Sequence, residues 1–152
     1  MVVGACSPGG GSATPAPVLQ TVPDGGFQAE FRGVPERQQR TSKSTPDRVI
    51  VTYKAKVAGG EVAIAYADYP GRNLSLDRLA EGIGDELDGT VESRTALTVM
   101  GYPAVDLVVK TERGTVYERL LVRGIRMYTL IATAQSGRPA AYDHLLETFV
   151  LL

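Results

Sequence analysis

The feature that most constrains the fold is the stretch from Thr90 to Ala134, which holds four runs of strand-forming residues. The runs are VESRTALTV, GYPAVDLVVKT, GTVYERLLVRG and IRMYTLIATA. Along them, side chains of different polarity alternate with a period of two, which is typical of β-strands whose two faces meet different surroundings. Gly101, Gly114 and Gly124 stand at the breaks, where tight turns favour glycine. We therefore predict an antiparallel meander on which the rest of the chain packs.

The second face of this meander is only partly polar, because Val108, Leu121 and Leu130 lie opposite the core-facing set. A sheet of this kind is covered on both sides. Two amphipathic helices are available, one over Ser75–Asp88 with Ser75 as its N-cap, and one over Pro139–Glu147. The expected fold class is α+β, an α/β/α sandwich with a central, mainly antiparallel sheet and two main helices.

Two more strands precede the first helix. Val49–Val57 alternates clearly, and a Gly-Gly hairpin turn leads to a return strand, Val62–Tyr69, that is apolar on both faces. Gly82 and Gly84 in the following helix suggest that it closely approaches a strand. The small residues on one face of the return strand would leave room for such a helix; they are Ala63, Ala65 and Ala67.

The segment before these strands is short and mixed. Phe27–Phe31 alternates apolar with polar residues and predicts a half-buried strand, which Gly33 and Pro35 end. The polar stretch Glu36–Arg48 predicts a solvated loop or an edge strand, with a basic contact surface for an anionic partner as the alternative.

Composition limits the classes of function. With 152 residues the chain has room for one domain, which we place at 23–152, after a Gly/Ser/Pro-rich tether at 1–22. A net charge of −1 gives no general attraction to nucleic acid. One Cys cannot form an internal disulfide, and one Cys with one His cannot complete an N/S zinc site. We therefore expect neither a metal nor a cofactor.

Cys6 has a distinctive context. Val3-Gly4-Ala5-Cys6 resembles the lipobox of bacterial lipoproteins, in which the Cys is acylated, and a Gly/Ser/Pro-rich linker follows it as in that class. No basic and apolar export segment precedes Cys6, so the export signal would lie upstream of Met1. The alternative is a flexible tail that happens to contain a Cys. The resemblance implies a membrane anchor on Cys6 and a location on the extracytoplasmic face of a bacterial membrane.

The order of the elements, together with several short motifs, is similar to that of PsbP/Mog1-like domains, particularly bacterial lipoproteins of that type. The motifs are Phe31-Arg32-Gly33-Val34-Pro35, Met100-Gly101-Tyr102-Pro103-Ala104, Arg126-Met127-Tyr128-Thr129-Leu130 and the chain end Thr148-Phe149-Val150-Leu151. Thr148 stands where that type has Ser. The resemblance covers about Phe27 to Leu152. It implies the same sandwich and a non-enzymatic binding or assembly role, and it brings no catalytic residues.

Candidate chemical groups are few. His144 lies in the second helix next to Asp143, and neighbouring helical residues do not face each other. The acidic residues of the first helix do not have the spacing of a calcium loop. Tyrosines outnumber phenylalanines seven to three, which suits partly wet pockets. Four residues at or near predicted strand ends are candidate ligand-binding residues: Tyr66, Tyr69, Arg72 and Tyr102.

Two hypotheses of function follow. The first is a non-catalytic, lipid-anchored extracytoplasmic domain that binds a protein partner or assists assembly. The second is a carrier or sensor of a small apolar or lipid-like ligand, in a pocket between the first helix and the sheet. An enzyme is the third class, and no acid–base pair or nucleophile can be named for it.

Overall fold

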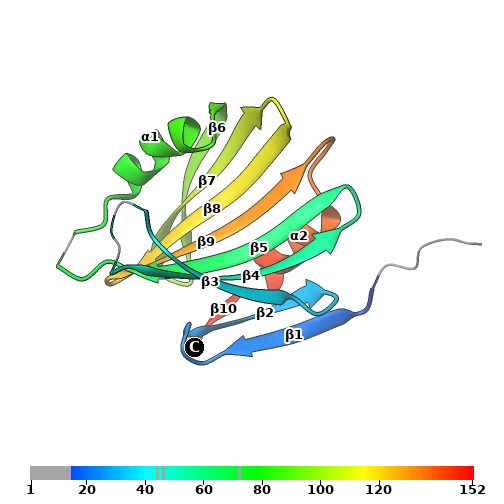
Figure 1. Ribbon diagram of the computed structural model, residues 1–152, viewed down its shortest axis with the longest axis horizontal. Coiled ribbons are helices and arrows are strands. Elements are labelled where there is room, and N and C mark those ends of the chain that lie inside the picture. The colour runs from blue at the N-terminus through cyan, green and yellow to red at the C-terminus, as the bar shows by residue number, and fades with distance from the viewer. Residues whose placement is uncertain (1–14, 44, 46, 72) are drawn as a thin grey trace, which may run out of the picture.

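The computed structural model describes residues 15–43, 45, 47–71 and 73–152, which form two antiparallel sheets and two helices (Figure 1). The larger sheet has seven strands in the order β3-β4-β5-β9-β8-β7-β6. Its strands are β3 (Glu36–Thr41), β4 (Val49–Val57), β5 (Gly60–Asp68), β6 (Gly89–Val99), β7 (Tyr102–Thr111), β8 (Gly114–Arg123) and β9 (Arg126–Ala134). The smaller sheet has the order β1-β2-β10, with β1 (Pro17–Val22), β2 (Phe27–Arg32) and β10 (Val150–Leu151).

The predicted meander is confirmed. Strands β6, β7, β8 and β9 pair antiparallel with their neighbours in chain order, and β9 then pairs with β5. The polar stretch after Pro35 begins with the edge strand β3, whose six side chains are all exposed. Its pairing with β4 therefore depends on backbone hydrogen bonds rather than on burial.

The two helices lie on opposite faces of the seven-stranded sheet, as the sandwich prediction requires (Figure 1). Helix α1 (Leu76–Glu86) packs on β6, β7 and β8. Helix α2 (Ala140–Thr148) packs on β9 and β2, on the other face. Strand β2 also packs on β4, so the smaller sheet belongs to the same layer as α2. The alanine face of β5 was expected to leave room for a closely packed helix, but α1 packs on β6–β8 and the alanines line a hollow beside it.

Helix α1 begins as the sequence predicts. The Ser75 hydroxyl accepts a hydrogen bond from the Arg78 N–H at 3.4 Å, and Asp77 lies in the first turn. The two helical glycines have different surroundings. A Cβ at Gly84 would lie 3.3 Å from the carbonyl oxygen of Gly89, so Gly84 marks the close approach. A Cβ at Gly82 would meet no atom within 4 Å.

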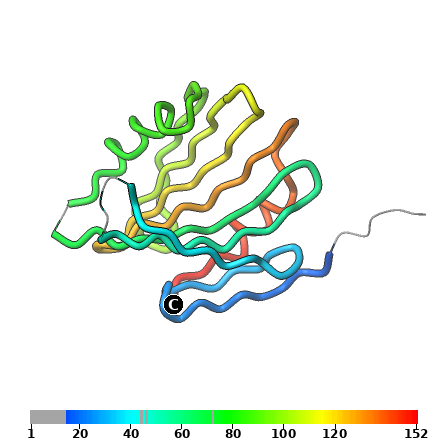
Figure 2. The backbone as a smooth tube through the Cα atoms, in the orientation of Figure 1, coloured from blue at the N-terminus to red at the C-terminus, as the bar shows by residue number. Residues whose placement is uncertain are grey.

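The predicted boundary between the tether and the domain, after residue 22, is wrong. Residues 17–22 were assigned to a flexible tether, but they form β1, which pairs with β2 from Pro17–Arg32 to Val22–Phe27. The sequence PVLQTV does not alternate in polarity, because Leu19 is exposed and Gln20 lies on the more buried face, so no strand pattern marks it. Figure 2 shows the blue start and the red end of the described chain in this one sheet.

Buried aromatic rings join the smaller sheet to the larger one. Phe27 packs edge-on against Tyr66 and Tyr128 at centroid distances of 6.0 and 6.1 Å. The Tyr128 hydroxyl is buried and donates to the carbonyl oxygen of Gly25 at 2.6 Å. At the other end of β2, Thr148 accepts a hydrogen bond from the Glu30 N–H at 3.0 Å. These contacts fix α2 and the N-terminal hairpin on one face and leave the other face to α1.

Candidate functional site

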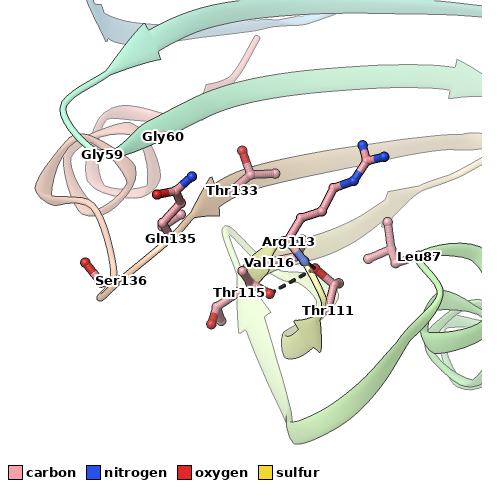
Figure 3. A pocket seen from close by; sticks show the side chains of 12 residues that line it. Gly59, Gly60, Leu87, Thr111, Arg113, Thr115, Val116, Thr133, Gln135 and Ser136 are labelled. Atoms are coloured by element: carbon pink, nitrogen blue, oxygen red, sulfur yellow. Dashed lines mark hydrogen bonds between the residues drawn. The ribbon is translucent and has the colours of Figure 1, made fainter.

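Several hollows along the described residues reach the roughly 300–1,000 Å³ of ordinary ligand sites, and two of them have a mainly apolar lining. One is a depression of about 610 Å³ at the end of the larger sheet (Figure 3). The turns of two hairpins and the chain after β9 surround it, and Arg113, Gln135 and Ser136 are exposed there. Much of its lining is backbone, and Thr111 donates its hydroxyl to the Gly114 carbonyl 2.9 Å away. The buried polar residue of this lining, Thr115, is uncharged, and no charged side chain is buried there.

The other hollow, hereafter the α1 groove, has a volume of about 510 Å³ and lies between α1 and the uncovered part of the same sheet face. Leu79, Gly82 and Ile83 of α1 form its wall. Its floor consists of small or apolar side chains on neighbouring strands, namely Thr52, Ala63, Ala65, Ala67, Met127, Thr129 and Ile131. An apolar floor with a few polar groups is the usual lining of a small-molecule site.

Strand register explains why these floor residues share one face. Thr52 pairs with Ala65, and Ala65 pairs with Thr129. Thr129 in turn pairs with Leu120, which α1 covers. Side chains at paired positions point to the same face of a sheet. The row therefore passes from a part of the face that α1 covers to a part that it leaves open, and the open part carries the smallest side chains.

Glu118 is the unusual residue of the α1 groove. It lies on β8 between Val116 and Leu120, on the face that α1 covers, and it is only 4% exposed. Its neighbours across the sheet are Leu107 and Ile131, which are both apolar. No residue that the structure describes donates a hydrogen bond to its carboxyl group or forms an ion pair with it. A buried carboxylate in this position is costly.

The environment of Glu118 changes its titration. Burial, together with the negative charge of Glu86 on α1, raises the pKa of the Glu118 carboxyl from 4.5 to about 7. Burial makes the larger contribution. The carboxyl is therefore divided between its neutral and charged forms near neutral pH.

The charged groups of the α1 groove are arranged around its edge. Arg40 and Lys54 come from β3 and β4, and Glu61 comes from β5. Helix α1 contributes Arg78 near its start and Glu86 at its end. Tyr69 also lines the groove, and the guanidinium of Arg48 lies 3.8 Å from the centre of its ring. The groove is thus apolar along its floor and charged at its rim.

The four residues predicted to bind a ligand do not form one cleft. Tyr66 and Tyr69 both line the α1 groove, although the Tyr66 ring is packed on Phe27 and is 9% exposed. Tyr102 is not among the groove residues; it packs against the core on the other face, with Arg123 5.6 Å from its ring centre. Arg72 lies outside the described residues, and so does Cys6, the predicted site of lipidation.

His144 serves the structure of α2. Its Nε2 lies 2.7 Å from a Glu30 carboxylate oxygen, which joins α2 to β2. The nearby Thr148 hydroxyl donates to the carbonyl oxygen of His144 rather than to its ring. Within residues 15–43, 45, 47–71 and 73–152, no three metal-ligating side chains gather. No helix in the described part of the chain is long and apolar enough to cross a membrane.

Sequence reasoning missed Glu118, although a signal was present. In the β8 run, Val116, Leu120 and Val122 occupy alternate positions and form one apolar face. Glu118 stands two residues from Val116 and from Leu120, so it is a charged residue in a row that is otherwise apolar. A charge at such a position must be paired, neutralised or offered to a ligand. That reasoning would have identified it without a structure.

Comparisons with known proteins address the fold. No model of a known protein family matches the chain, and no curated protein sequence matches it. Among solved structures, it is similar to cyanobacterial PsbP (CyanoP) from Synechocystis sp. PCC 6803, with a TM-score of 0.62 and 11% identity over 99% of both chains. A protein of unknown function from Pseudomonas aeruginosa matches 84% of this chain and 87% of its own, at 17% identity and a TM-score of 0.44. The chain therefore has a PsbP-like fold, as the sequence resemblance implied.

Proposed function

We propose that this PsbP-like domain is a non-catalytic binding protein that holds a small, largely apolar ligand in the α1 groove. One observation carries the proposal: the open part of the sheet face beside α1 is floored by the alanines of β5 and by Thr129. This arrangement supports the second of the two hypotheses from the sequence, a carrier or sensor with a pocket between helix and sheet. The ligand would lie along the strands, with α1 as one wall.

The small side chains of the floor are what give the groove its depth. Interior strands of a sheet usually carry branched or aromatic residues, because these pack well on a pleated surface. Strand β5 carries Ala63, Ala65 and Ala67 on this face instead, while its other face carries Val62, Ile64 and Tyr66. Gly82 keeps the wall low in the same way, since a side chain there would meet open space. Floor and wall thus both lack the atoms that would fill the groove.

A fluorescent probe tests this proposal directly. The uncharged dye N-phenyl-1-naphthylamine emits strongly only in apolar surroundings, and the chain contains no Trp to interfere. We expect emission to rise on addition of the wild-type protein and to saturate. Ala65→Phe, which places a ring on the groove floor, should abolish the rise. Gly82→Leu, which fills the groove from the exposed helix side, should weaken it severalfold or more.

A matched control distinguishes a ring that blocks the α1 groove from a ring that merely disturbs the sheet. Ala96 is exposed on β6, outside the α1 groove, so Ala96→Phe adds the same ring elsewhere on the sheet. It should leave probe binding unchanged. Equal binding by wild type, Ala65→Phe and Gly82→Leu, all with cooperative thermal unfolding, would refute the α1 groove as the site.

Attachment to a membrane is a separate proposal, which rests on the sequence Val3-Gly4-Ala5-Cys6. A lipid on Cys6 would hold the domain on the extracytoplasmic face of a bacterial membrane, where a protein partner is a further expectation. The test is Cys6→Ala in the full-length protein, followed by membrane fractionation. We expect the protein to leave the membrane fraction, and an unchanged distribution would contradict the anchor.

A further inference from the structure

We infer that the ligand of the α1 groove carries a protonated amine, which binds the carboxylate of Glu118 while the apolar part of the ligand lies over the alanine floor. This inference rests on the proposed function and specifies its ligand. It begins from the placement of Glu118, a carboxyl group that lines the groove at only 4% exposure. Nothing in the described part of the chain provides it with a hydrogen-bond donor.

The residues around Glu118 are apolar and offer its carboxyl group no side-chain hydrogen-bond donor. Val116 and Leu120 flank it along β8, and Leu107 and Ile131 flank it across the sheet. Ile83 of α1 belongs to the same apolar cluster as Leu107 and Leu120. A carboxylate flanked by apolar side chains loses most of its hydration, and a donor in the groove would offset that loss. A ligand in the groove can supply that donor.

The negative charge of Glu86 near Glu118 favours a ligand group that is positively charged over one that is a neutral hydrogen-bond donor. Glu86, at the end of α1, is the charged group that acts on Glu118, and its effect is repulsive. A protonated amine would relieve this repulsion and form a charge-assisted hydrogen bond at the same time. A carboxylate ligand would add a third negative charge, so we expect fatty acids to bind poorly.

None of the basic residues that line the groove forms an ion pair with Glu118. In the sheet, Lys54 lies three strands from Glu118, which is about 14 Å between backbones at the usual strand spacing. Arg40 lies one strand farther away and is displaced along the strands as well, since it pairs with Ile50. Arg78 is two helical turns before Glu86 on α1. The remaining charged group of the lining, Glu61, is itself acidic.

The shape of the groove suggests an extended ligand. From the row of Glu118 and Ile131 to the row of Met127 is four residues along β9, or about 13 Å of strand. Both ends of this path line the α1 groove, and Thr129 lies between them. A straight alkyl chain with an amine at one end fits this geometry, with the amine at Glu118 and the chain directed toward Met127.

The experiment compares three ligands of equal chain length as competitors for bound N-phenyl-1-naphthylamine at pH 8. We expect n-octylamine to displace the dye from the wild-type protein at a concentration at least tenfold lower than 1-octanol does, since a hydrogen bond to a charged group contributes about 1.5–3 kcal/mol. Octanoate should be weaker than both. Glu118→Gln should retain dye binding and lose the preference for the amine. Glu92→Gln, at an exposed position of β6, should keep that preference.

A pH series adds a readout that a merely structural role would not produce. The amine stays protonated throughout, so the preference of the wild type should grow from pH 6 to pH 8 as Glu118 loses its proton, and the preference of Glu118→Gln should not. If octylamine and octanol compete equally with bound dye, the inference is wrong and the proposed function stands. If the dye does not bind at all, calorimetry of octylamine with wild type and Glu118→Gln decides, because equal heats would overturn the inference.

Discussion

The guanidinium of Arg126 binds both carboxylate oxygens of Asp68, with Nε 2.6 Å from Oδ1 and Nη2 2.9 Å from Oδ2. Its third nitrogen, Nη1, donates to the carbonyl oxygen of Asp24 at 2.7 Å. Arg126 thereby joins β9 to the end of β5 and to the turn between β1 and β2. Its guanidinium also lies 5.0 Å from the ring centre of Tyr66. One side chain thus connects the two sheets at one edge of the fold.

Removing the charge of Asp68 should have a modest and pH-dependent effect. The hydrogen bonds from Arg126 hold the pKa of the Asp68 carboxyl below its usual value of 3.8. Because the folded-state pKa is lowered, the stabilisation is complete above pH 3.8 and is lost as the pH falls through the folded-state pKa. The pair is partly exposed, so we expect Asp68→Asn to cost no more than about 1 kcal/mol at pH 7.

Urea unfolding of wild type and Asp68→Asn at pH 7 and in steps below pH 4 measures this effect. The difference between them should shrink as the acid protonates Asp68. A difference that stays constant across this range would show that the charge of Asp68 does not contribute.

Glu118 should make the domain less stable as the pH rises. Its pKa is raised from 4.5 to about 7 in the folded state, so the folded protein binds more protons than the unfolded chain between these values. Stability should therefore fall from pH 4.5 through about pH 7 and level off above it. A shift of this size corresponds to roughly 3 kcal/mol. Glu118→Gln should remove most of this slope.

The measurement is denaturant unfolding between pH 5 and pH 8 for wild type, Glu118→Gln and the surface control Glu92→Gln. We expect Glu118→Gln to be the most stable of the three at pH 8. Parallel pH profiles for all three proteins would contradict the assignment of the raised pKa to Glu118.

The two glycines of α1 should respond differently to alanine. Gly82 is exposed and a Cβ there meets no atom within 4 Å, so Gly82→Ala should raise the free energy of unfolding by up to about 1 kcal/mol. At Gly84 a Cβ would lie 3.3 Å from the Gly89 carbonyl oxygen and 3.4 Å from Cγ2 of Val91. Gly84→Ala should therefore gain less or lose stability. Equal gains at both positions by thermal unfolding would show that α1 does not approach β6 so closely.

Thr148 should be replaceable by Ser and not by Val. Its hydroxyl accepts from the Glu30 N–H at 3.0 Å and donates to the His144 carbonyl oxygen at 2.8 Å. Thr148→Val keeps the shape and leaves the Glu30 N–H without this acceptor, which should cost about 1–3 kcal/mol. Thr148→Ser keeps the hydroxyl and should cost much less. Chemical unfolding compares the two variants, and a Ser variant as unstable as the Val variant would count against the hydrogen bonds.

Burial alternates clearly in some of the elements that the sequence predicts correctly, such as β2 and β9. The meander and both helices follow from side-chain patterns, because each buries one face more than the other. Strand β3 carries no such pattern, since all its side chains are exposed and it pairs with β4 at the edge of the sheet. Strand β1 was missed because the polarity of its residues does not alternate with their burial, as the exposed Leu19 shows.

The site was harder to predict than the fold. The alanines of β5 were noticed, but sequence cannot say which strands a helix will cover, and α1 covers β6–β8 rather than β5. Whether Ala65 faces a helix or a groove depends on that choice. Tyr69 and Tyr102 both lie at predicted strand ends next to loops, but that position does not specify the face on which each ring packs. Glu118 alone carried a readable signal, as a charge within an apolar row.

The most direct test of the central claim, that the α1 groove binds a small apolar ligand, is amide chemical-shift mapping by heteronuclear NMR with N-phenyl-1-naphthylamine. We predict that the shifted amides cluster on Ala63, Ala65, Gly82 and Thr129, and that Ala65→Phe abolishes the shifts. Shifts confined to the turns around Arg113 and Gln135, or no shifts at saturating dye, would contradict the account.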